Sequence, residues 1–117
     1  MCGKAVEASH LARFDSKVQK GDIVFLRSKF RGKDRPILGR SAAEWLLDKN
    51  VKCVGTNDES IIFGRTAHEI LLKKEVPLIE CLVNLDLLSK DRVFVVALLL
   101  KVIGIGGSPA RVIAIEE

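Results

Sequence analysis

Short apolar runs alternate with segments of helical spacing along all 117 residues of the chain. Residues 23–27 (IVFLR) follow a Gly-Asp turn and are rich in the β-branched and aromatic residues typical of strands. Residues 41–50 carry apolar side chains at the spacing of one helix face, and residues 51–54 form a second apolar run that ends at Gly55. A strand, a helix and another strand in this order predict an α/β fold. We expect a mixed sheet with short flanking helices.

Two Ser/Thr–Glu pairs have the spacing of a helix capping box. Ser41 and Glu44 mark the start of the first expected helix. Thr66 and Glu69 mark the start of a second helix, which ends near residue 74. Pro77 then prevents this helix from continuing, because proline has no backbone N–H and its ring clashes with the preceding turn.

The other predicted elements are short. They are a strand at residues 4–8, a loop at residues 32–39, a strand at residues 78–80, a helical turn at residues 84–88, and strands at residues 93–101 and 111–115. Residues 93–100 are all apolar, which is typical of a strand buried on both faces. The run is too short to span a bilayer, so we expect no membrane segment. Because no linker or internal repeat divides the sequence, one domain over residues 1–117 is expected.

The net charge and the cysteine content limit which partners and which cellular compartment we expect for this chain. The formal net charge of +4 comes from 19 basic and 15 acidic residues spread along the chain. The exception, residues 29–35 (KFRGKDR), could meet phosphates, but a solvated loop is the favoured interpretation and no nucleic-acid partner is expected. The three cysteines, Cys2, Cys53 and Cys81, are odd in number and lack CxxC spacing. This pattern favours the reducing cytoplasm, as does the lack of a charged-then-apolar leader.

A histidine and a glutamate stand at the two ends of one helix-to-strand segment. His68 lies in the first turn of the second expected helix, and Glu80 ends the strand that follows it. An imidazole and a carboxylate brought together could be two ligands for a divalent zinc or manganese ion. A catalytic metal normally takes at least three ligands from protein, so the alternative is an ion pair between the two side chains.

Several motifs of the chain follow one another in a characteristic order. They are the turn and strand of GDIVFLRS (21–28), the helix and strand of residues 41–55, Ser60, the segment from His68 to Glu80, Asn84-Leu-Asp86, and Gly107-Ser-Pro-Ala-Arg111. In this order and spacing the chain resembles the C-terminal half of the cyclase family of metal-dependent hydrolases, which includes kynurenine formamidase and isatin hydrolase. The resemblance runs over residues 3–115. It implies a partial version of that family's swivelling β/β/α fold.

The resemblance also implies which residues would hold a metal. In this family five side chains bind the metal, three from an early His-x-Gly-Thr-His-x-Asp motif and two from later in the chain. The later pair matches His68 and Glu80, whereas the early motif is absent from this sequence. The only other histidine, His10, has no partner at ligand spacing. The expected metal site, for zinc or manganese, is therefore incomplete.

Three other residues match the family in the neighbourhood of its site. Ser60, Asn84 and Arg111 could lie around the ligands or toward the substrate. Each also has a simpler interpretation. Ser60 has no base at a spacing that would make it a nucleophile, Asn84 is better explained as a cap of the helical turn, together with Asp86, and Arg111 could anchor the glycine-rich turn.

Two departures from the family pattern replace polar side chains near the expected ligands. Gly55-Thr-Asn57 stands where the family has Gly-x-Asp, and residues 80–85 (ECLVNL) stand where the family often has Glu-Asn-Leu-Thr-Asn-Leu. Such polar groups can orient a metal ligand by hydrogen bonding, so their loss would weaken the site. Cys81 is expected to be a small buried residue, although a thiol beside a metal would also be a candidate ligand.

Three functions are compatible with these residues. The first is a formamidase-like (arylformamidase-like) hydrolase of amide C–N bonds, in which a metal would polarise the carbonyl. The second is a non-catalytic binding or assembly module derived from the family. The third is a truncated form that needs a partner chain. The isolated chain is expected to be inactive, because the early motif is absent.

The missing front half also predicts association. A sheet that lacks its neighbouring strands leaves an open apolar edge, and such edges associate. Residues 93–100 and 112–115 are the strands expected to seek a partner. We therefore expect a homodimer or a higher oligomer, or a complex with a separate chain that supplies the front half.

Overall fold

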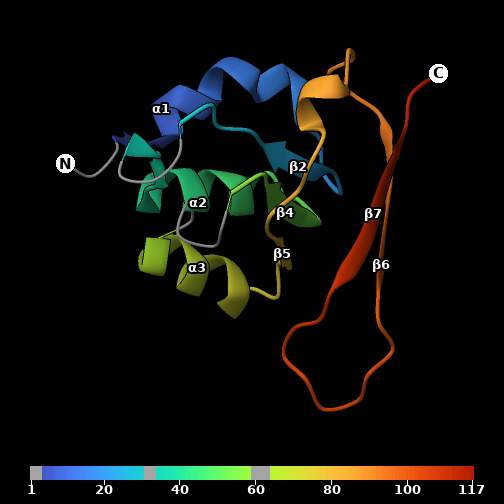
Figure 1. Cartoon of the computed structure of the whole chain (residues 1–117). Coiled ribbons are helices and arrows are strands. Elements are labelled where there is room, and N and C mark those ends of the chain that lie inside the picture. Colours follow the sequence, from blue (N-terminus) through green and yellow to red (C-terminus); the bar gives the residue numbers. More distant parts are fainter. Residues whose placement is uncertain (1–3, 31–33, 59–63) are drawn as a thin grey trace. The chain divides into compact units, whose positions relative to one another are not determined.

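The structure is a computed structural model that describes residues 4–30, 34–58 and 64–117. These residues form two compact units, Met1–Val83 and Asn84–Glu117 (Figure 1). The single domain expected over residues 1–117 stays a prediction. In the described residues, no helix is both long enough and apolar enough to cross a membrane.

The first unit contains a parallel sheet of three strands. Its strands are β2 (Ile23–Leu26), β4 (Cys53–Thr56) and β5 (Leu78–Ile79), in the order β2-β4-β5. Ile23 pairs with Cys53, and Val54 pairs with Leu78. All four residues of β4 are buried, as expected for the middle strand of a covered parallel sheet. The strands predicted at residues 23–27, 51–54 and 78–80 are therefore present, with the second shifted by two residues.

Two very short strands form a second parallel pair. They are β1 (Ala5–Val6) and β3 (Ile37–Leu38). The backbone N–H of Gly39 donates to the carbonyl of Val6 at 2.8 Å, which closes the end of this pair. Within the predicted loop at residues 32–39, the structure thus places a strand, and the loop prediction is wrong at Ile37–Leu38. Two residues are too few to show the alternation by which a strand is recognised in a sequence.

Among the described residues, three α-helices accompany these sheets. They are α1 (Ala8–Leu11), which continues into a 3-10 helix η1 (Ala12–Lys17), α2 (Arg40–Asp48) and α3 (Gly64–Lys73). Helix α2 contacts both α1 and α3, and Figure 1 shows α2 between the other two. The core of the unit consists of apolar side chains from these helices, from β3 and β4, and from the turns before β4 and β5. They are Leu11, Leu38, Ala42, Ala43, Leu46, Val51, Val54, Ala67, Leu71 and Val76. The mixed α/β fold with short helices is thereby confirmed.

The predicted capping box at the start of α2 is not formed. The residue that caps the helix is Gly39, and it makes no side-chain hydrogen bond to the helix. The hydroxyl of Ser41 instead accepts a hydrogen bond from the N–H of Ala8 at 2.9 Å and donates to the Glu7 carboxylate. Ser41 therefore connects α2 to the start of α1, because its hydroxyl finds partners on the neighbouring element.

The second predicted capping box, Thr66 and Glu69, is also wrong. Helix α3 begins at Gly64, so both residues lie inside it. The Glu69 carboxylate accepts a hydrogen bond from Nε of Arg65 at 3.0 Å, an i,i+4 pair on the exposed face of the helix. The capping spacing recurs by chance within helices, because residues three and four apart share a face.

Helix α3 ends in a Schellman motif that sets the direction of β5. Glu75 has a left-handed backbone with φ of 59°, its N–H donates to the carbonyl of Leu72 at 2.9 Å, and the N–H of Val76 donates to Leu71 at 3.0 Å. Val76 and Leu71 are both in the core, so the turn is stabilised by the apolar contact typical of this motif. Pro77 then follows and the chain enters β5, as the sequence predicts.

The second unit is a 3-10 turn followed by an antiparallel hairpin. The turn is η4 (Leu85–Leu87), and the strands are β6 (Phe94–Leu99) and β7 (Ala110–Ile115). The predicted helical turn and the two strands are present. Asn84 precedes η4 with φ of 65° and makes no side-chain hydrogen bond to it, so the prediction that its side chain caps the turn is wrong.

Strand β6 is not buried on both faces, in contrast to the prediction for residues 93–100. Phe94 is 67% exposed and Leu99 is 71% exposed. In the part of the chain that the structure describes, β6 pairs with β7 alone, so no sheet extends on its other side. The prediction of a strand is confirmed, but burial of both its faces needs neighbouring strands, and in the described residues only β7 pairs with it.

The Glu116 side chain forms hydrogen bonds at the end of the hairpin opposite its loop. Its Oε1 accepts hydrogen bonds from Oγ of Ser89 at 2.7 Å and from the N–H groups of Ser89 and Lys90 at 2.8 and 2.7 Å. The Ser89 hydroxyl, and then these amides and the Lys90 charge, lower the pKa of the Glu116 carboxyl below its ordinary value of 4.5. The carboxylate thus joins the segment before β6 to the end of β7.

Lowering the pH is expected to break the hydrogen bonds that the Glu116 carboxylate accepts from Ser89 and Lys90. Because the folded pKa of Glu116 is depressed, its stabilisation is complete above the unfolded pKa and is lost as the pH falls through the folded value. In a titration followed by NMR, the amide shifts of Ser89 and Lys90 should move with an apparent pKa below 4.5. Glu116→Gln should remove this transition, and a midpoint at or above 4.5 in the wild type would contradict the arrangement.

Candidate functional site

The candidate site lies where the three parallel strands end. Ser28 follows β2, Asn57 and Asp58 follow β4, and Glu80 comes directly after β5. The carboxyl ends of parallel strands meet at one edge of the sheet, where open α/β sheets most often bind ligands. The fold therefore brings polar residues from three separate segments to the same edge.

Asn57 joins the segments after β2 and β4. Its side-chain Nδ2 donates to the carbonyl of Ser28 at 2.9 Å, and its Oδ1 accepts from the N–H of Ser28 at 3.0 Å. An amide can donate and accept in this way, whereas an ionised carboxylate can only accept. The asparagine at this departure from the family pattern thus has a structural role in this chain.

Asp58 joins the segments after β4 and β5. Its carbonyl accepts a hydrogen bond from the N–H of Cys81 at 2.8 Å, which fixes the backbone next to Glu80. Its side chain is nearly buried, and Oδ1 lies 3.4 Å from Nη1 of Arg35. The ion pair offsets part of the free energy that it costs to remove the carboxylate from water.

Arg35 and Asp58 are not among the site residues that the sequence predicts. Arg35 belongs to the basic stretch at residues 29–35, for which the sequence favours a solvated loop, whereas its side chain is only 20% exposed. Residues 31–33 of that stretch lie outside the described residues. Asp58 directly follows the altered Gly55-Thr-Asn57 motif, and a carboxylate beside a motif of this kind was the available signal.

His68 and Glu80 are near neighbours. Nε2 of His68 lies 3.6 Å from Oε1 of Glu80, and the two side chains are 35% and 38% exposed. Helix α3 carries His68 next to the buried Ala67, and Glu80 comes directly after β5. Both side chains remain in contact with solvent, so a further ligand could approach them.

The distance between Nε2 of His68 and Oε1 of Glu80 is suitable for two ligands of one metal ion. Two atoms bonded at about 2.1 Å to one tetrahedral ion lie roughly 3.4 Å apart, close to the 3.6 Å between Nε2 of His68 and Oε1 of Glu80. Nitrogen from imidazole and oxygen from carboxylate are ligands that both zinc and manganese accept. The two side chains are therefore suited to occupy two of the coordination positions of a zinc or manganese ion.

A complete metal site is not formed by the described residues alone. Within them, no group of three or more His, Cys, Asp and Glu side chains is placed to hold a metal. His10 is engaged in α1, where its Nδ1 accepts a hydrogen bond from the N–H of Glu7 at 2.9 Å. The site shown by this part of the chain is thus a pair of candidate ligands.

The other predicted site residues lie in the second unit or outside the described residues. Ser60 lies outside the described residues. Asn84 and Arg111 belong to the second unit, where Asn84 precedes η4 and Arg111 stands opposite Leu98 in the hairpin. Cys81 is exposed and has a left-handed backbone with φ of 57°, so the expectation that it is buried is wrong. The chain turns outward directly after β5, which carries the thiol away from the core.

Comparison with known proteins identifies what this arrangement resembles. The family model named Cyclase, described as "Putative cyclase", matches residues 3–61. A solved structure, described as a potential metal-dependent hydrolase with cyclase activity, superimposes with a TM-score of 0.78 at 29% identity. A second, described as a predicted metal-dependent hydrolase from Bacillus stearothermophilus, gives 0.77 at 29% identity. Among curated proteins, the search found no match.

The two solved relatives are longer than this chain. They cover 96% and 94% of its residues, but the chain covers only 58% and 56% of theirs. It therefore spans a little over half of their length, in agreement with the partial resemblance expected from the sequence. The family model accounts for half of the chain and the superpositions for nearly all of it, and we conclude that the chain belongs to the cyclase family.

Proposed function

We propose that this chain contributes one half of the metal site of a cyclase-like hydrolase that cleaves amide C–N bonds. The observation that carries the proposal is the separation of 3.6 Å between Nε2 of His68 and Oε1 of Glu80. The remaining ligands would come from a segment with the early His-x-Gly-Thr-His-x-Asp motif, either in a separate chain or in another part of the assembly. A divalent metal held there would polarise the carbonyl of the scissile amide.

The described residues support this role by holding Glu80 in place. The hydrogen bond from Cys81 to the Asp58 carbonyl fixes the backbone beside Glu80, and the Asn57–Ser28 bonds hold the neighbouring segment. His68 is held by α3, whose C-terminal turn packs into the core. A site on a rigid frame of this kind loses less free energy when a metal orders it.

A second candidate is a non-catalytic binding or assembly module that retains the family fold. The observation that favours it is the lack of a third candidate ligand among the described residues. In that case His68 and Glu80 form an ion pair or hydrogen bond on the surface, worth at most about 1 kcal/mol. The two candidates differ in whether the pair takes part in a reaction.

Hydrolysis of an N-formyl arylamine, with added zinc or manganese, distinguishes them. We expect the purified chain to show no hydrolysis above that of buffer with the same metal. Addition of a chain that carries the His-x-Gly-Thr-His-x-Asp motif should produce activity, and His68→Ala and Glu80→Gln should each reduce it by at least about a hundredfold, because a missing ligand weakens the metal and its chemistry together.

His10→Ala and Glu75→Gln are the matched controls, since they remove the other imidazole and a neighbouring carboxylate. They should retain the activity of the mixture. Activity of the mixture that survives His68→Ala would exclude the proposed role of the pair. Failure of the mixture to hydrolyse the amide, when both chains are folded and bind each other, would favour the non-catalytic module.

A further inference from the structure

The Arg35 side chain reaches the segment after β4 from a different part of the first unit. Arg35 directly precedes Pro36 and strand β3, which pairs with β1. A residue before proline is restricted to extended backbone conformations, so the direction in which Arg35 leaves this strand pair is limited. Its side chain is 20% exposed, and Nη1 lies 3.4 Å from Oδ1 of Asp58.

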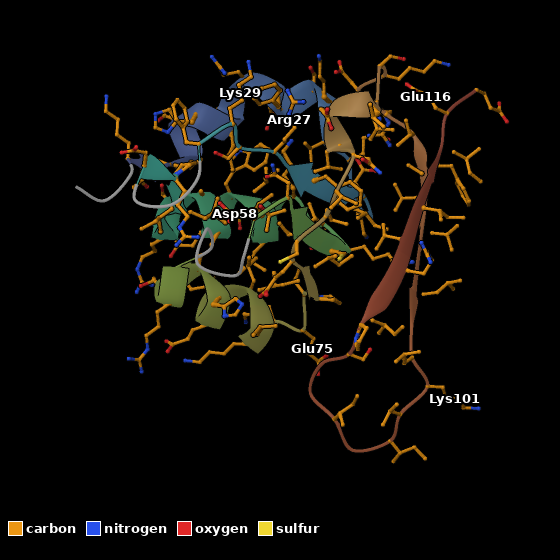
Figure 2. All side chains as sticks on the ribbon, viewed as in Figure 1. Arg27, Lys29, Asp58, Glu75, Lys101 and Glu116 are labelled. Atoms are coloured by element: carbon orange, nitrogen blue, oxygen red, sulfur yellow. The ribbon has the colours of Figure 1, made fainter. Side chains whose placement is uncertain are left out.

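Asp58 is held through its backbone as well as through its side chain. The side chain is 10% exposed, and Figure 2 shows Asp58 amid the helices and strands of the first unit. Its N–H donates to Oγ1 of the buried Thr56 at 3.3 Å, and its carbonyl accepts from the N–H of Cys81 at 2.8 Å. One residue thus connects the Arg35 guanidinium to the backbone that follows Glu80.

Glu80 precedes two residues whose backbone N–H groups bond to the end of β4. The N–H of Cys81 donates to the Asp58 carbonyl, and the N–H of Leu82 donates to the Thr56 carbonyl at 3.0 Å. Cys81 has a left-handed backbone with φ of 57°. A residue other than glycine keeps this conformation only where its surroundings hold it. The direction of the chain at Glu80 therefore depends on the Asp58 carbonyl.

We propose that Arg35 is a positioning residue for Glu80. Its charge keeps the nearly buried Asp58 carboxylate in place, and the Asp58 carbonyl then holds the turn after β5 through the N–H of Cys81. Arg35 acts through these contacts and is not itself a metal ligand. The inference rests on the proposed function in one respect, because the placement of Glu80 matters for chemistry only if Glu80 binds the metal.

The physical basis is the cost of a carboxylate that is enclosed by protein without its counter-charge. When Arg35 is replaced by a neutral residue, the segment at Asp58 gains free energy of hydration by moving the carboxylate toward water. This movement weakens the hydrogen bond to Cys81. A neutral amide at position 58 carries no such cost, so the effect of losing Arg35 depends on the charge of Asp58.

Amide hydrogen exchange of the full chain without metal, followed by NMR, tests the connection from Arg35 to the turn. Arg35→Gln should accelerate exchange of the Cys81 amide at least about tenfold and leave that of Val54, in the middle strand, within about twofold of the wild type. Arg35→Lys, which keeps the charge, should retain most of the protection of Cys81. An unchanged Cys81 rate in Arg35→Gln would overturn the proposal.

The double variant Arg35→Gln/Asp58→Asn tests whether the charge is the cause. Its Cys81 amide should exchange within about threefold of the wild-type rate, because both charges are removed together. The same acceleration in the double variant as in Arg35→Gln would overturn the proposed dependence on charge.

Lys49→Gln is the matched control. The Lys49 side chain is 22% exposed, close to the 20% of Arg35, and its Nζ lies 2.6 Å from Oδ1 of Asp15. This ion pair joins α2 to η1, also in the first unit. Its loss should leave the exchange rate of the Cys81 amide within about twofold of the wild type.

Zinc affinity, measured by calorimetry, provides a readout that a general loss of stability does not move. Arg35→Gln should weaken zinc binding about tenfold, as expected for a residue that orients a ligand, and Lys49→Gln should leave it unchanged. If the wild type binds zinc and Arg35→Gln binds it equally tightly, Arg35 does not position Glu80. A wild type that binds no zinc would contradict the proposed function, and the exchange rate of Cys81 would then still decide whether Arg35 holds the turn.

Discussion

Leu46→Ala is expected to lower the free energy of unfolding of the first unit by about 3–4 kcal/mol. Leu46 lies on α2 and is fully buried, in the core shared with Leu71 and Val54. Truncation would remove three methyl-sized groups from the centre of this cluster and leave a cavity that the two helices and the sheet cannot fill by small movements. This is the largest single effect that the packing of the unit predicts.

Urea denaturation followed by the fluorescence of Trp45 measures this change, because the chain has one tryptophan and it lies on the same helix. Leu72→Ala on α3 is the control, since it makes the same chemical change at a side chain that is half exposed. Leu72→Ala should lower the free energy of unfolding by less than about 1 kcal/mol. Similar losses for the two variants would mean that the core around α2 is not packed as described.

Gly55→Val is expected to destabilise the same unit by about 2–3 kcal/mol through overpacking. Gly55 lies in the buried strand β4, and a Cβ atom at this position would come within 2.7 Å of the Phe25 side chain and 2.8 Å of Leu82. Both neighbours would have to move, and Leu82 belongs to the segment that follows Glu80. The substitution should therefore also disturb the site.

Gly106→Val is the matched control for this overpacking, because a Cβ atom there meets no atom within 4 Å. It should change the free energy of unfolding by no more than about 0.5 kcal/mol. Because Trp45 lies in the first unit and Gly106 in the second, the unfolding transition followed by Trp45 fluorescence should change in Gly55→Val and stay unchanged in Gly106→Val. If Gly55→Val were as stable as the control, the close approach of Phe25 and Leu82 to β4 would be excluded.

Much of the first unit can be predicted from local patterns. The apolar runs at residues 23–27 and 51–54 and the helical spacing after residue 40 are long enough to show their periods. The predicted helix starts are less accurate, because the Ser41 hydroxyl bonds to residues at the start of α1 and Thr66 lies inside α3. Strand β3 was missed because two residues carry no period.

The candidate site could be predicted only in part, and mainly through the resemblance to a family. Spacing alone does not bring His68 and Glu80 together, since they are twelve positions apart in the sequence and a helix-to-strand turn lies between them. The Arg35–Asp58 pair joins segments 23 residues apart, and such long-range contacts leave no local pattern in a sequence. The exposure of β6 likewise depends on the sheet around it, which the apolar run does not reveal.

The central claim is that His68 and Glu80 act together as ligands of one divalent metal. Calorimetric titration of the chelator-stripped full chain with zinc, beside His68→Ala, Glu80→Gln and the His10→Ala control, tests it most directly. We predict one binding site per chain or per dimer, retained in His10→Ala and weakened at least about tenfold, or 1.4 kcal/mol, in each of the other two variants. Binding that His68→Ala leaves unchanged, or no binding above its background in the wild type, would contradict the claim.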